Sequence, residues 1–508
     1  MSKEILLGID IGTSGCKVAA FDLDGGVVAT SSQSYETRYP GPQYVEQDAM
    51  DWWRAACRCL EDMRGQGLDV ERIAAIGIDG TSWACLPVDA QGTPLRPAMI
   101  WMDRRAEPQA KWMRETIGED KLIALSGNPV DAAYITPKML WLKANEPEIY
   151  ARTRYFLQCN AFIAMQLTGM PSQDLSQGYG FHFFDIAKLC YDEAMLAALQ
   201  LDAEKLAPIV SCHQIVGQVT ENAARETGLC AGTPVVAGGL DAACCSLGAG
   251  VIRPGQTQEQ GGQAGGMSIL TDQPLIHPQL ILGCHVLPGG WLLQGGSVGG
   301  GGTMRWFSQQ LAAAEQREAK AQGKSVFEVL SDEAGAIPAG SEGLIFLPYM
   351  AGERSPIWDS DARGVFFGLS YDKGRAHMVR AMMEGVAYSL HHNIQTAAQV
   401  GAQVATMVSV GGSANSRVWT QIKSDVTGKR IEVPYSDHAT PLGAAILAGV
   451  GCGAYAGFDE AVQRCVRIQR VHEPDGQTHD RYGQYFEIYQ GLYPKLKDDF
   501  AKLAQAAR

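Results

Sequence analysis

The chain has 508 residues, of which 46% are hydrophobic and 19% are charged, as in folded globular proteins. This length is too great for a single hydrophobic core, so we expect two or more domains. The formal net charge of −13 argues against nucleic acid and anionic membranes as partners, because both are bound through accumulated lysine and arginine.

The cysteines and the N-terminal segment bear on the compartment. Thirteen cysteines without a Cys-x-x-Cys pair predict free thiols in a reducing environment and argue against a cysteine-based metal site. The first strand begins almost at once, with no basic region followed by an apolar core, so we expect no targeting peptide. No apolar run approaches the roughly 20 residues that span a bilayer. We expect a soluble, cytoplasmic protein with no membrane partner.

The first stretch predicts a β-hairpin with a glycine-rich turn. Residues 5–11 and 17–23 are largely apolar or β-branched, and the turn between them is Gly12-Thr-Ser-Gly15. Glycines let backbone N–H groups converge, and hydroxyls and a lysine add donors, which favours a phosphate cradle. The groups expected to face the phosphates are Gly12, Thr13, Ser14 and Lys17.

Asp10 ends the first strand of this hairpin. A carboxylate beside a phosphate cradle repels the phosphate unless a cation lies between them, so Asp10 predicts a bridging Mg²⁺ ion. The alternative is an ordinary tight hairpin with a structural aspartate.

A helix is expected from about Asp48, and residues 73–89 then predict a strand, a polar turn and a second strand. Polar residues at the end of a buried strand are typical ligand contacts in α/β folds. The substrate-pocket candidates here are Asp79, Thr81, Ser82 and Trp83. A capping aspartate and a core tryptophan are the alternative.

The segment 98–106 is a strand followed by a polar cluster. Trp101 offers a flat apolar face, Asp103 accepts hydrogen bonds from hydroxyls, and Arg105 donates them, which suits a sugar. A salt-bridge cluster would look similar.

Residues 234–250 predict a buried strand, Gly238-Gly239, and an alanine-rich helix that begins at Asp241. We expect Asp241 to be both an N-cap and a base that takes a proton from an attacking hydroxyl. A simple cap is the alternative. Residues 257–270 then predict a second hairpin with a glycine-rich turn, which suggests a duplicated fold.

Together these motifs resemble the FGGY carbohydrate kinases. The order Asp10-x-Gly-Thr-Ser-x-x-Lys17, Trp101-x-Asp-x-Arg105, Gly238-Gly-x-Asp241 and Gly411-Gly-Ser-Ala-Asn-Ser416 is similar to that family. Phe346-Leu-Pro-Tyr-Met-Ala-Gly-Glu-Arg-Ser-Pro356 and Gly364-x-Phe-x-Gly-Leu369 resemble its xylulokinase branch.

The resemblance implies an α/β fold of two actin-like ATPase (ribonuclease H-like) domains with a cleft between them. The expected division is 1–248, with the sugar site and first phosphate loop, and 249–508, with the nucleotide site and a C-terminal helical tail. ATP and Mg²⁺ would be the cofactors and a small sugar would be the substrate. The sequence leaves the oligomeric state undecided, and a homodimer is one alternative. By matching position, the nucleotide side comprises Gly261, Gly262, Gly301, Arg305, Gly411, Gly412 and Asn415.

Two departures from the xylulokinase pattern leave the sugar open. Xylulokinases usually carry Gln-Met-His-Gly where this chain has Thr81-Ser-Trp-Ala84, and Asn where it has Ala242. The usual Gly-Thr-Ser of the second phosphate loop is here Gly261-Gly-Gln263, which removes hydroxyl donors.

The sequence thus predicts transfer of the γ-phosphoryl group of ATP to a hydroxyl of a ketose similar to D-xylulose. The alternatives are a kinase for ribulose, an aldonic acid or a polyol, and a non-catalytic actin-fold regulator that binds nucleotide.

Overall fold

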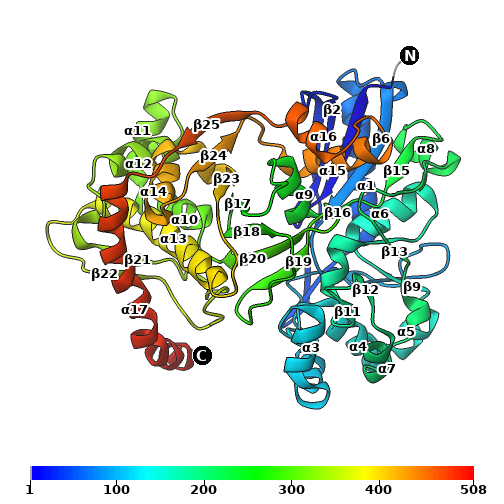
Figure 1. The fold of residues 1–508 in the computed structure, drawn as a ribbon, viewed down its shortest axis with the longest axis horizontal. Coiled ribbons are helices and arrows are strands. Elements are labelled where there is room, and N and C mark those ends of the chain that lie inside the picture. Colours follow the sequence, from blue (N-terminus) through cyan, green and yellow to red (C-terminus); the bar gives the residue numbers. More distant parts are fainter. Residues whose placement is uncertain (1–2, 508) are drawn as a thin grey trace. The chain divides into compact units, whose positions relative to one another are not determined.

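The computed structural model describes residues 3–507, which form two compact units (Figure 1). The first unit contains the residues up to Pro254 together with Leu270–Leu292 and His438–Arg467. The second contains Gly255–Ile269, Leu293–Asp437 and the residues from Ile468 onward. Each unit is built around its own mixed sheet.

The sheet of the first unit is organised by its N-terminal hairpin. Strands β1 (Ile5–Ile11) and β2 (Gly15–Asp22) are antiparallel, as predicted, and β3 (Val27–Ser34) continues from β2. On its other side β1 pairs in parallel with β6 (Ile73–Gly80), which in turn pairs in parallel with β15 (Pro234–Val236) and β16 (Gly239–Leu240). The edge strand β14 (Ile215–Gln218) is antiparallel to β15.

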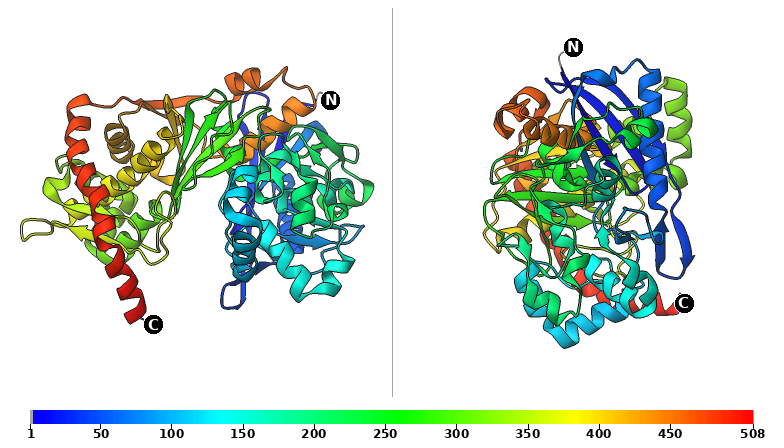
Figure 2. Two further views of the ribbon diagram at one scale, coloured as in Figure 1. Left: turned by 60° about the horizontal axis from the view of Figure 1, so that its bottom comes forward. Right: turned by 90° about the vertical axis from the view of Figure 1, so that its right-hand side faces the viewer.

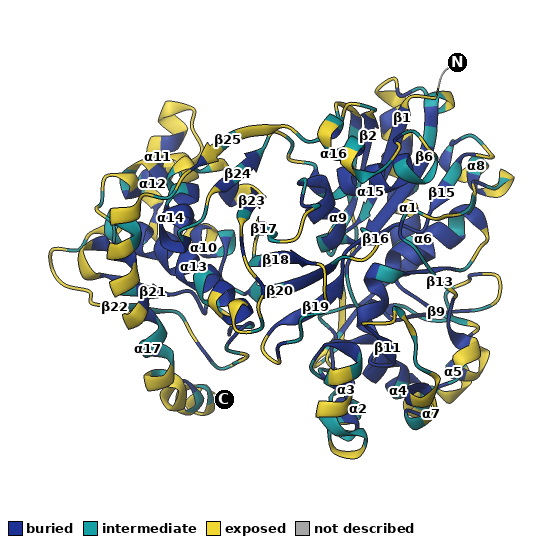
Figure 3. Cartoon of the chain, viewed as in Figure 1, coloured by how far each residue is buried: buried dark blue, intermediate teal, exposed yellow. Residues whose placement is uncertain are grey.

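Helices cover both faces of this sheet. Alternate residues of β1 pack with α1 (Ala49–Gly65) and α6 (Cys159–Thr168) in one apolar core. Asp48 caps α1 by accepting from the backbone of Met50, which confirms the predicted helix start. Figure 3 shows the central strands largely in the colour of buried residues.

The opposite face is covered by α9 (Asp241–Gly248) and by α15 (Ala439–Gly451), which comes from late in the chain. Both views of Figure 2 place the orange segment with α15 beside the blue strands. A Cβ on Gly8 would lie 2.0 Å from the carbonyl oxygen of Pro441, so glycine allows the helix to approach β1 this closely.

The units therefore differ from the division expected between residues 248 and 249. Residues 270–292 and 438–467 belong to the first unit although they follow that boundary. The physical reason for the later segment is the packing of α15 on β1 and α9, since a Cβ on Gly443 would lie 1.9 Å from the carbonyl oxygen of Cys244.

The second unit repeats the strand pattern of the first. An antiparallel hairpin of β17 (Gln256–Gly261) and β18 (Gly265–Thr271) pairs through β17 with parallel β23 (Thr406–Val410). Strand β24 (Ile431–Pro434) follows in parallel, and β25 (Ile468–His472) is antiparallel to it. This repetition confirms the duplicated fold that the second glycine hairpin predicts.

Helices α10 (Gly301–Leu311), α12 (Val326–Gly335), α13 (Arg375–Ala398), α14 (Arg417–Thr427) and α17 (Gly476–Ala506) belong to this second unit. Its apolar core joins the inner faces of α13, α14 and α17 to β21 (Ile345–Leu347). Strands β20 (Trp291–Ser297) and β22 (Val365–Phe367) and helix α11 (Ala313–Gln322) complete this region.

The other elements belong to the first unit. Its remaining strands are β4 (Arg38–Gly41), β5 (Tyr44–Gln47), β7 (Leu86–Val88), β8 (Ala98–Met99), β9 (Tyr155–Leu157), β10 (Gln173–Asp174), β11 (Phe184–Asp185), β12 (Cys190–Tyr191), β13 (Ile209–Val210) and β19 (Ile281–Cys284). Its remaining helices are α2 (Glu107–Trp112), α3 (Glu119–Ser126), α4 (Ile135–Asn145), α5 (Pro147–Arg152), α7 (Glu193–Ala198), α8 (Glu221–Thr227) and α16 (Phe458–Cys465). Within residues 3–507, no helix has the length and apolar character needed to cross a bilayer.

Candidate functional site

Three aspartates converge at one edge of the first unit's sheet. Asp10 is the penultimate residue of β1 and pairs in register with Asp79, the penultimate residue of β6. Asp79 pairs in turn with Gly239 of β16, and Asp241 follows two residues later. The carboxyl ends of parallel strands meet at the same sheet edge, which brings these three side chains together. We call Asp10, Asp79 and Asp241 the aspartate cluster.

Asp241 is the first residue of α9, and Leu240 holds the N-cap position. The prediction that Asp241 caps the helix is wrong in this respect, because its carboxylate accepts from the backbone of the adjacent Ala242 at 2.6 Å. It still lies in the first helical turn, where the helix dipole favours a negative charge.

The cluster is short of positive charge, and its pKa values reflect this. Burial, followed by the charge of Asp10, raises the pKa of Asp241 to about 7. Burial also raises the pKa of Asp10 to about 6, while a hydrogen bond with Asp79 and the charge of Lys17 oppose that shift. Lys17 pairs with Asp10 in the register of the hairpin. Asp241 therefore changes its protonation state near neutral pH.

Asp79 is the most deeply buried member of the aspartate cluster and does not face an open pocket. It is fully buried, and no nitrogen or hydroxyl group of the described residues donates to either of its carboxyl oxygens. Burial, with the charges of Asp10 and Asp241, raises the pKa of Asp79 well above its usual range. Burial therefore favours the neutral form of Asp79 over a third negative charge beside Asp10 and Asp241.

The first glycine turn is fixed by side chains from neighbouring segments. Gln47 donates to the backbone oxygen of Thr13 at 2.7 Å, and the Tyr35 hydroxyl donates to the carbonyl of Gly12. Trp101 donates from Nε1 to the Thr13 hydroxyl at 3.0 Å. Trp101, predicted as part of the sugar wall, is thus in contact with the phosphate turn, while Ser14 remains exposed.

Asp103 and Arg105 do not face an open site. Asp103 is fully buried and accepts from the backbone of Val45 at 2.7 Å and from Arg105 at 2.7 Å. Arg105 also pairs with Glu46 at 2.7 Å and lies 3.9 Å from the ring centre of Tyr44. The sugar-gripping role expected for this pair is corrected, because their hydrogen-bonding groups are used inside the protein; the pair holds β5 beside the Trp101 segment.

Trp83 forms the centre of an aromatic wall that sequence reasoning found only in part. Its ring stacks on Tyr134 at 4.1 Å between centroids, and Tyr179 lies at 5.8 Å. Trp83 has a positive φ of 60°, which a bulky residue rarely adopts outside functional or strained positions. The Trp83 indole N–H is buried without an acceptor, and the Ser82 side chain is hydrogen-bonded to Tyr179.

Polar groups behind this wall hold its shape. Lys138 is fully buried and donates to the carbonyls of Trp83 at 2.9 Å and Ile100 at 2.7 Å. Gln158 accepts from the backbone of Trp83 at 3.1 Å, and Thr81 is buried against the thiol of Cys159. No local motif marks Tyr134, Lys138 or Tyr179, so the sequence alone does not single out these three residues.

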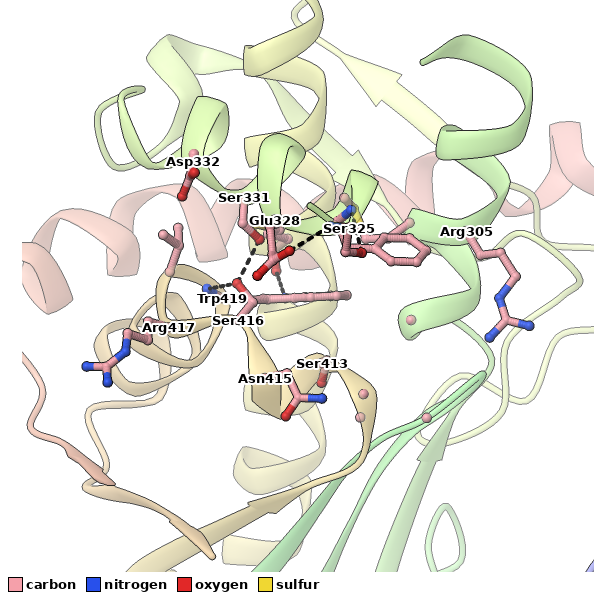
Figure 4. Close-up of a pocket in the computed structure, with 18 of the residues that line it drawn as sticks. Arg305, Ser325, Glu328, Ser331, Asp332, Ser413, Asn415, Ser416, Arg417 and Trp419 are labelled. Atoms are coloured by element: carbon pink, nitrogen blue, oxygen red, sulfur yellow. Dashed lines mark hydrogen bonds between the residues drawn. The ribbon is translucent and has the colours of Figure 1, made fainter. Parts of the chain in front are cut away.

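The second unit contains a pocket of about 780 Å³ (Figure 4). Six of the residues predicted for the nucleotide line it, namely Gly261, Gly262, Gly301, Arg305, Gly412 and Asn415. Gly411 lies behind them, where a Cβ would be 3.1 Å from the backbone of Gly261. The residues that the sequence did not reveal come mainly from α12 and α14, namely Ser325, Phe327, Glu328, Ser331, Asp332, Arg417, Val418 and Trp419.

The pocket combines flat apolar surface with glycine backbone and arginine. Figure 4 shows the Trp419 ring between the α12 residues above it and Ser413 and Asn415 below it, with Arg305 farther to the right. Ser416 receives the backbone N–H of Trp419 at 3.1 Å and contacts the Ser331 hydroxyl at 2.8 Å. An aromatic ring beside such a backbone turn can bind a planar base and its phosphates.

The second glycine turn, Gly261–Gly265, packs on the start of α10. The N–H of Gly301 donates to the carbonyl of Gly262 at 2.8 Å, and that of Gly302 donates to Gln263 at 2.9 Å. These two helix N–H groups are therefore already paired with the turn, which leaves the turn's own N–H groups and Arg305 to meet an anion.

The carboxylates of the site can be compared with the ligands that magnesium requires. No group of three or more His, Cys, Asp or Glu among residues 3–507 is placed to hold a metal ion. Magnesium in phosphoryl-transfer sites uses one or two carboxylates together with phosphate oxygens and water, so the partly exposed Asp10 beside the first glycine turn fits this requirement.

Sequence profiles place the chain in a known family of enzymes. The profile of the N-terminal domain of the FGGY family of carbohydrate kinases matches residues 5–248, and that of the C-terminal domain matches residues 266–452. The chain belongs to the FGGY family of carbohydrate kinases. The predicted fold class, two actin-like ATPase domains, is confirmed with it.

Individual relatives carry different substrate names. A xylulose kinase from Staphylococcus epidermidis is 30% identical over 506 residues, covering 99% of both chains. A gluconokinase from Bacillus subtilis is 28% identical and covers 99% of this chain and 98% of its own. The crystal structure of a xylulose kinase from Rhodospirillum rubrum has a TM-score of 0.89 and 28% identity, covering 98% of this chain and 100% of the other.

Proposed function

We propose that this ATP-dependent carbohydrate kinase phosphorylates a hydroxyl of a ketose similar to D-xylulose. The observation that carries the proposal is Asp241, a half-buried carboxyl whose pKa is raised to about 7 next to Asp10 and the first glycine turn. A general base works best when its pKa lies near the operating pH. The similarity to xylulose kinases over nearly the whole chain supports the choice of acceptor.

Asp241 would orient the acceptor hydroxyl and accept its proton as the new oxygen–phosphorus bond forms. The bond between the γ-phosphorus and the β,γ-bridging oxygen breaks in the same step, and ADP carries away that oxygen. The first helical turn of α9 favours the ionised carboxylate before the proton arrives.

Asp10 would hold magnesium, which supplies neutralising charge for the phosphate oxygens when it is bound. In this proposal the hydrogen bond with Asp79 fixes the orientation of the Asp10 carboxylate. The backbone of Gly12, the hydroxyls of Thr13 and Ser14, and Lys17 would contact the phosphates from the first unit.

The nucleotide is assigned to the pocket of the second unit. Trp419 and Phe327 would lie against the base, and the second glycine turn and Arg305 would contact the phosphates. The volume of about 780 Å³ lies within the range of cofactor and ligand pockets.

The aromatic wall around Trp83 would form one side of the acceptor site. Aromatic faces and neutral polar groups suit a polyhydroxy compound without charge. In the segments that carry the wall, residues 81–83, 134–138 and 177–182, the single lysine or arginine is Lys138, and its ammonium group donates to two backbone carbonyls. This favours a neutral ketose.

An aldonic acid is the second candidate acceptor, because a gluconokinase is among the full-length relatives. Its carboxylate would have to be bound close to the aspartate cluster, where like charge disfavours it. Ribulose and polyols also remain candidate acceptors, because they are neutral and suit the same aromatic wall.

The test is ADP release from Mg-ATP with D-xylulose, D-ribulose, D-gluconate and xylitol, for the parent and for Asp241→Asn. We expect D-xylulose to give the highest kcat/KM and the variant to lose this stimulation. The proposed specificity for a ketose similar to D-xylulose fails if another acceptor gives a higher kcat/KM. The proposed role of Asp241 as the base fails if Asp241→Asn keeps the parent rate.

A further inference from the structure

A buried ion pair lies behind the nucleotide pocket of the second unit. The Lys423 ammonium of α14 is 2.7 Å from a carboxylate oxygen of Glu259 in β17. Both side chains are almost completely excluded from solvent, at 1% and 4% exposure. Neither residue belongs to the predicted site.

This pair connects three parts of the pocket. Lys423 also donates to the Ser413 hydroxyl in the loop Gly411–Ser416 at 2.8 Å, and Glu259 accepts from Ser409 at the end of β23. The ammonium lies 5.2 Å from the ring centre of Trp419, which lines the pocket. The Lys423 ammonium therefore contacts three parts of the pocket: the strand that leads into the second glycine turn, the loop with Ser413, and the aromatic surface of Trp419.

The contact with the glycine turn leaves no spare room. A Cβ on Gly261 would lie 1.6 Å from the Ser413 hydroxyl oxygen and 3.3 Å from the Lys423 nitrogen. Lys423 and Ser413 therefore set how closely the turn and the loop approach each other.

The chemistry of the turn makes this spacing important. Gly261-Gly262-Gln263 has no hydroxyl to offer a phosphate, so its donors are the backbone N–H groups and the Gln263 amide, and their position depends on what packs behind the turn. A buried ion pair is weak evidence of stabilisation, because apolar side chains of similar volume often serve as well. We therefore consider the effect of this ion pair on the position of the turn and not its effect on stability.

We propose that Lys423 is a positioning residue for the nucleotide: through Glu259 and Ser413 it holds the second glycine turn and the loop Gly411–Ser416 at the separation that Mg-ATP and Mg-ADP require. This inference rests on the proposed assignment of the nucleotide to this pocket. It predicts that the pair controls nucleotide affinity beyond any effect on folding.

The experiment measures Mg-ADP binding by isothermal titration calorimetry with the full-length protein, together with the melting temperature. The variants are Lys423→Met, Glu259→Gln and the double variant Glu259→Gln/Lys423→Met. The matched control is Glu384→Gln/Arg380→Met, since Arg380 and Glu384 form a buried pair at 2.7 Å in α13 and neither lines the pocket.

We expect Lys423→Met to weaken Mg-ADP binding by about tenfold or more, as for loss of a hydrogen bond from a charged group. The double variant leaves no uncompensated charge, so we expect it to melt above Lys423→Met and yet to keep the weakened binding. The control pair should bind Mg-ADP within about twofold of the parent whatever its melting temperature.

Two results separate the possible failures. If the parent binds Mg-ADP and the double variant regains parental affinity together with stability, the pair is structural and the inference is overturned. If the parent itself does not bind Mg-ADP, the nucleotide assignment fails first, and with it the proposed function.

Discussion

The two glycine turns occupy equivalent places in the two sheets but have different surroundings. The first turn lies beside Asp10, within the aspartate cluster, and is fixed by side-chain hydrogen bonds from Gln47, Tyr35 and Trp101. The second turn, Gly261–Gly265, borders an open pocket of about 780 Å³ and has its charged pair, Glu259 and Lys423, buried behind it.

This difference suggests that the two copies of the duplicated fold have different roles in the proposed reaction. In the first unit a few ionisable groups with shifted pKa values carry the proposed chemistry, whereas in the second unit backbone placement and pocket shape carry nucleotide binding. Substitutions in the first unit should therefore change kcat, and those in the second should change the KM for ATP.

The largest expected effect is that of Asp241→Asn. Loss of a positioned general base lowers rates by about 10²–10⁴-fold, so we expect kcat to fall by about 10³-fold while KM for ATP changes less than about threefold. Steady-state kinetics with the best acceptor measures both. A rise in the KM for ATP as large as the fall in kcat would contradict the proposal that the first unit carries the chemistry and the second unit carries nucleotide binding.

A pair of adjacent glycines tests the second turn. Gly261→Ala places a Cβ 1.6 Å from the Ser413 hydroxyl oxygen and 2.7 Å from its Cβ, so we expect KM for ATP to rise by about 30-fold or more with a smaller change in kcat. Gly262→Ser has free space, with no atom nearer than 3.8 Å to the new Cβ, and restores a hydroxyl donor. We expect it to lower KM for ATP about threefold. Equal effects of the two substitutions would contradict the proposed geometry.

The pH profile sharpens the assignment of the base. Asp241 must be ionised to accept a proton, and its pKa is raised to about 7, so kcat/KM for the acceptor should fall about tenfold for each pH unit below 7. Mg-ADP affinity of the second unit, measured over the same range, serves as the control and should change little. A flat acceptor profile between pH 6 and 8 would exclude Asp241 as the titrating base.

The free energy of unfolding should change with pH in the opposite direction to the activity, because ionisation of Asp241 favours catalysis but disfavours the folded state. The native pKa of Asp241 is raised above its unfolded value of 3.8, so its favourable contribution is complete below pH 4 and is lost as the pH rises through about 7. Asp241→Asn should therefore exceed the parent in unfolding free energy at pH 8, by up to about 4 kcal/mol, and lose this advantage toward pH 4. Urea unfolding at pH 5 and pH 8 measures the difference.

The smallest effect is expected at the rim of the pocket. Phe327 lines the pocket but is 42% exposed, so Phe327→Ala should raise KM for ATP only about threefold and leave stability nearly unchanged. Kinetics and a thermal melt check both. A loss as large as that of Gly261→Ala would mean that the base, and not the phosphate contacts, dominates nucleotide binding.

The sequence by itself determined the local features. Six pocket residues of the second unit follow from the resemblance to the FGGY carbohydrate kinases. Both glycine hairpins and the helix start at Asp48 follow from strand patterning and short motifs. The hairpins and the helix start depend on neighbours close in the chain, so a single sequence is sufficient to predict them.

Only the tertiary structure decided what each side chain contacts. It turned Asp103 and Arg105 inward, buried Asp79 within the aspartate cluster, and joined Lys423 to Glu259 across 164 residues of sequence. It also returned α15 to the first unit. The identity of a polar residue shows which bonds it can make, but burial and distant partners determine which ones it makes, and these arise only when the whole chain is packed.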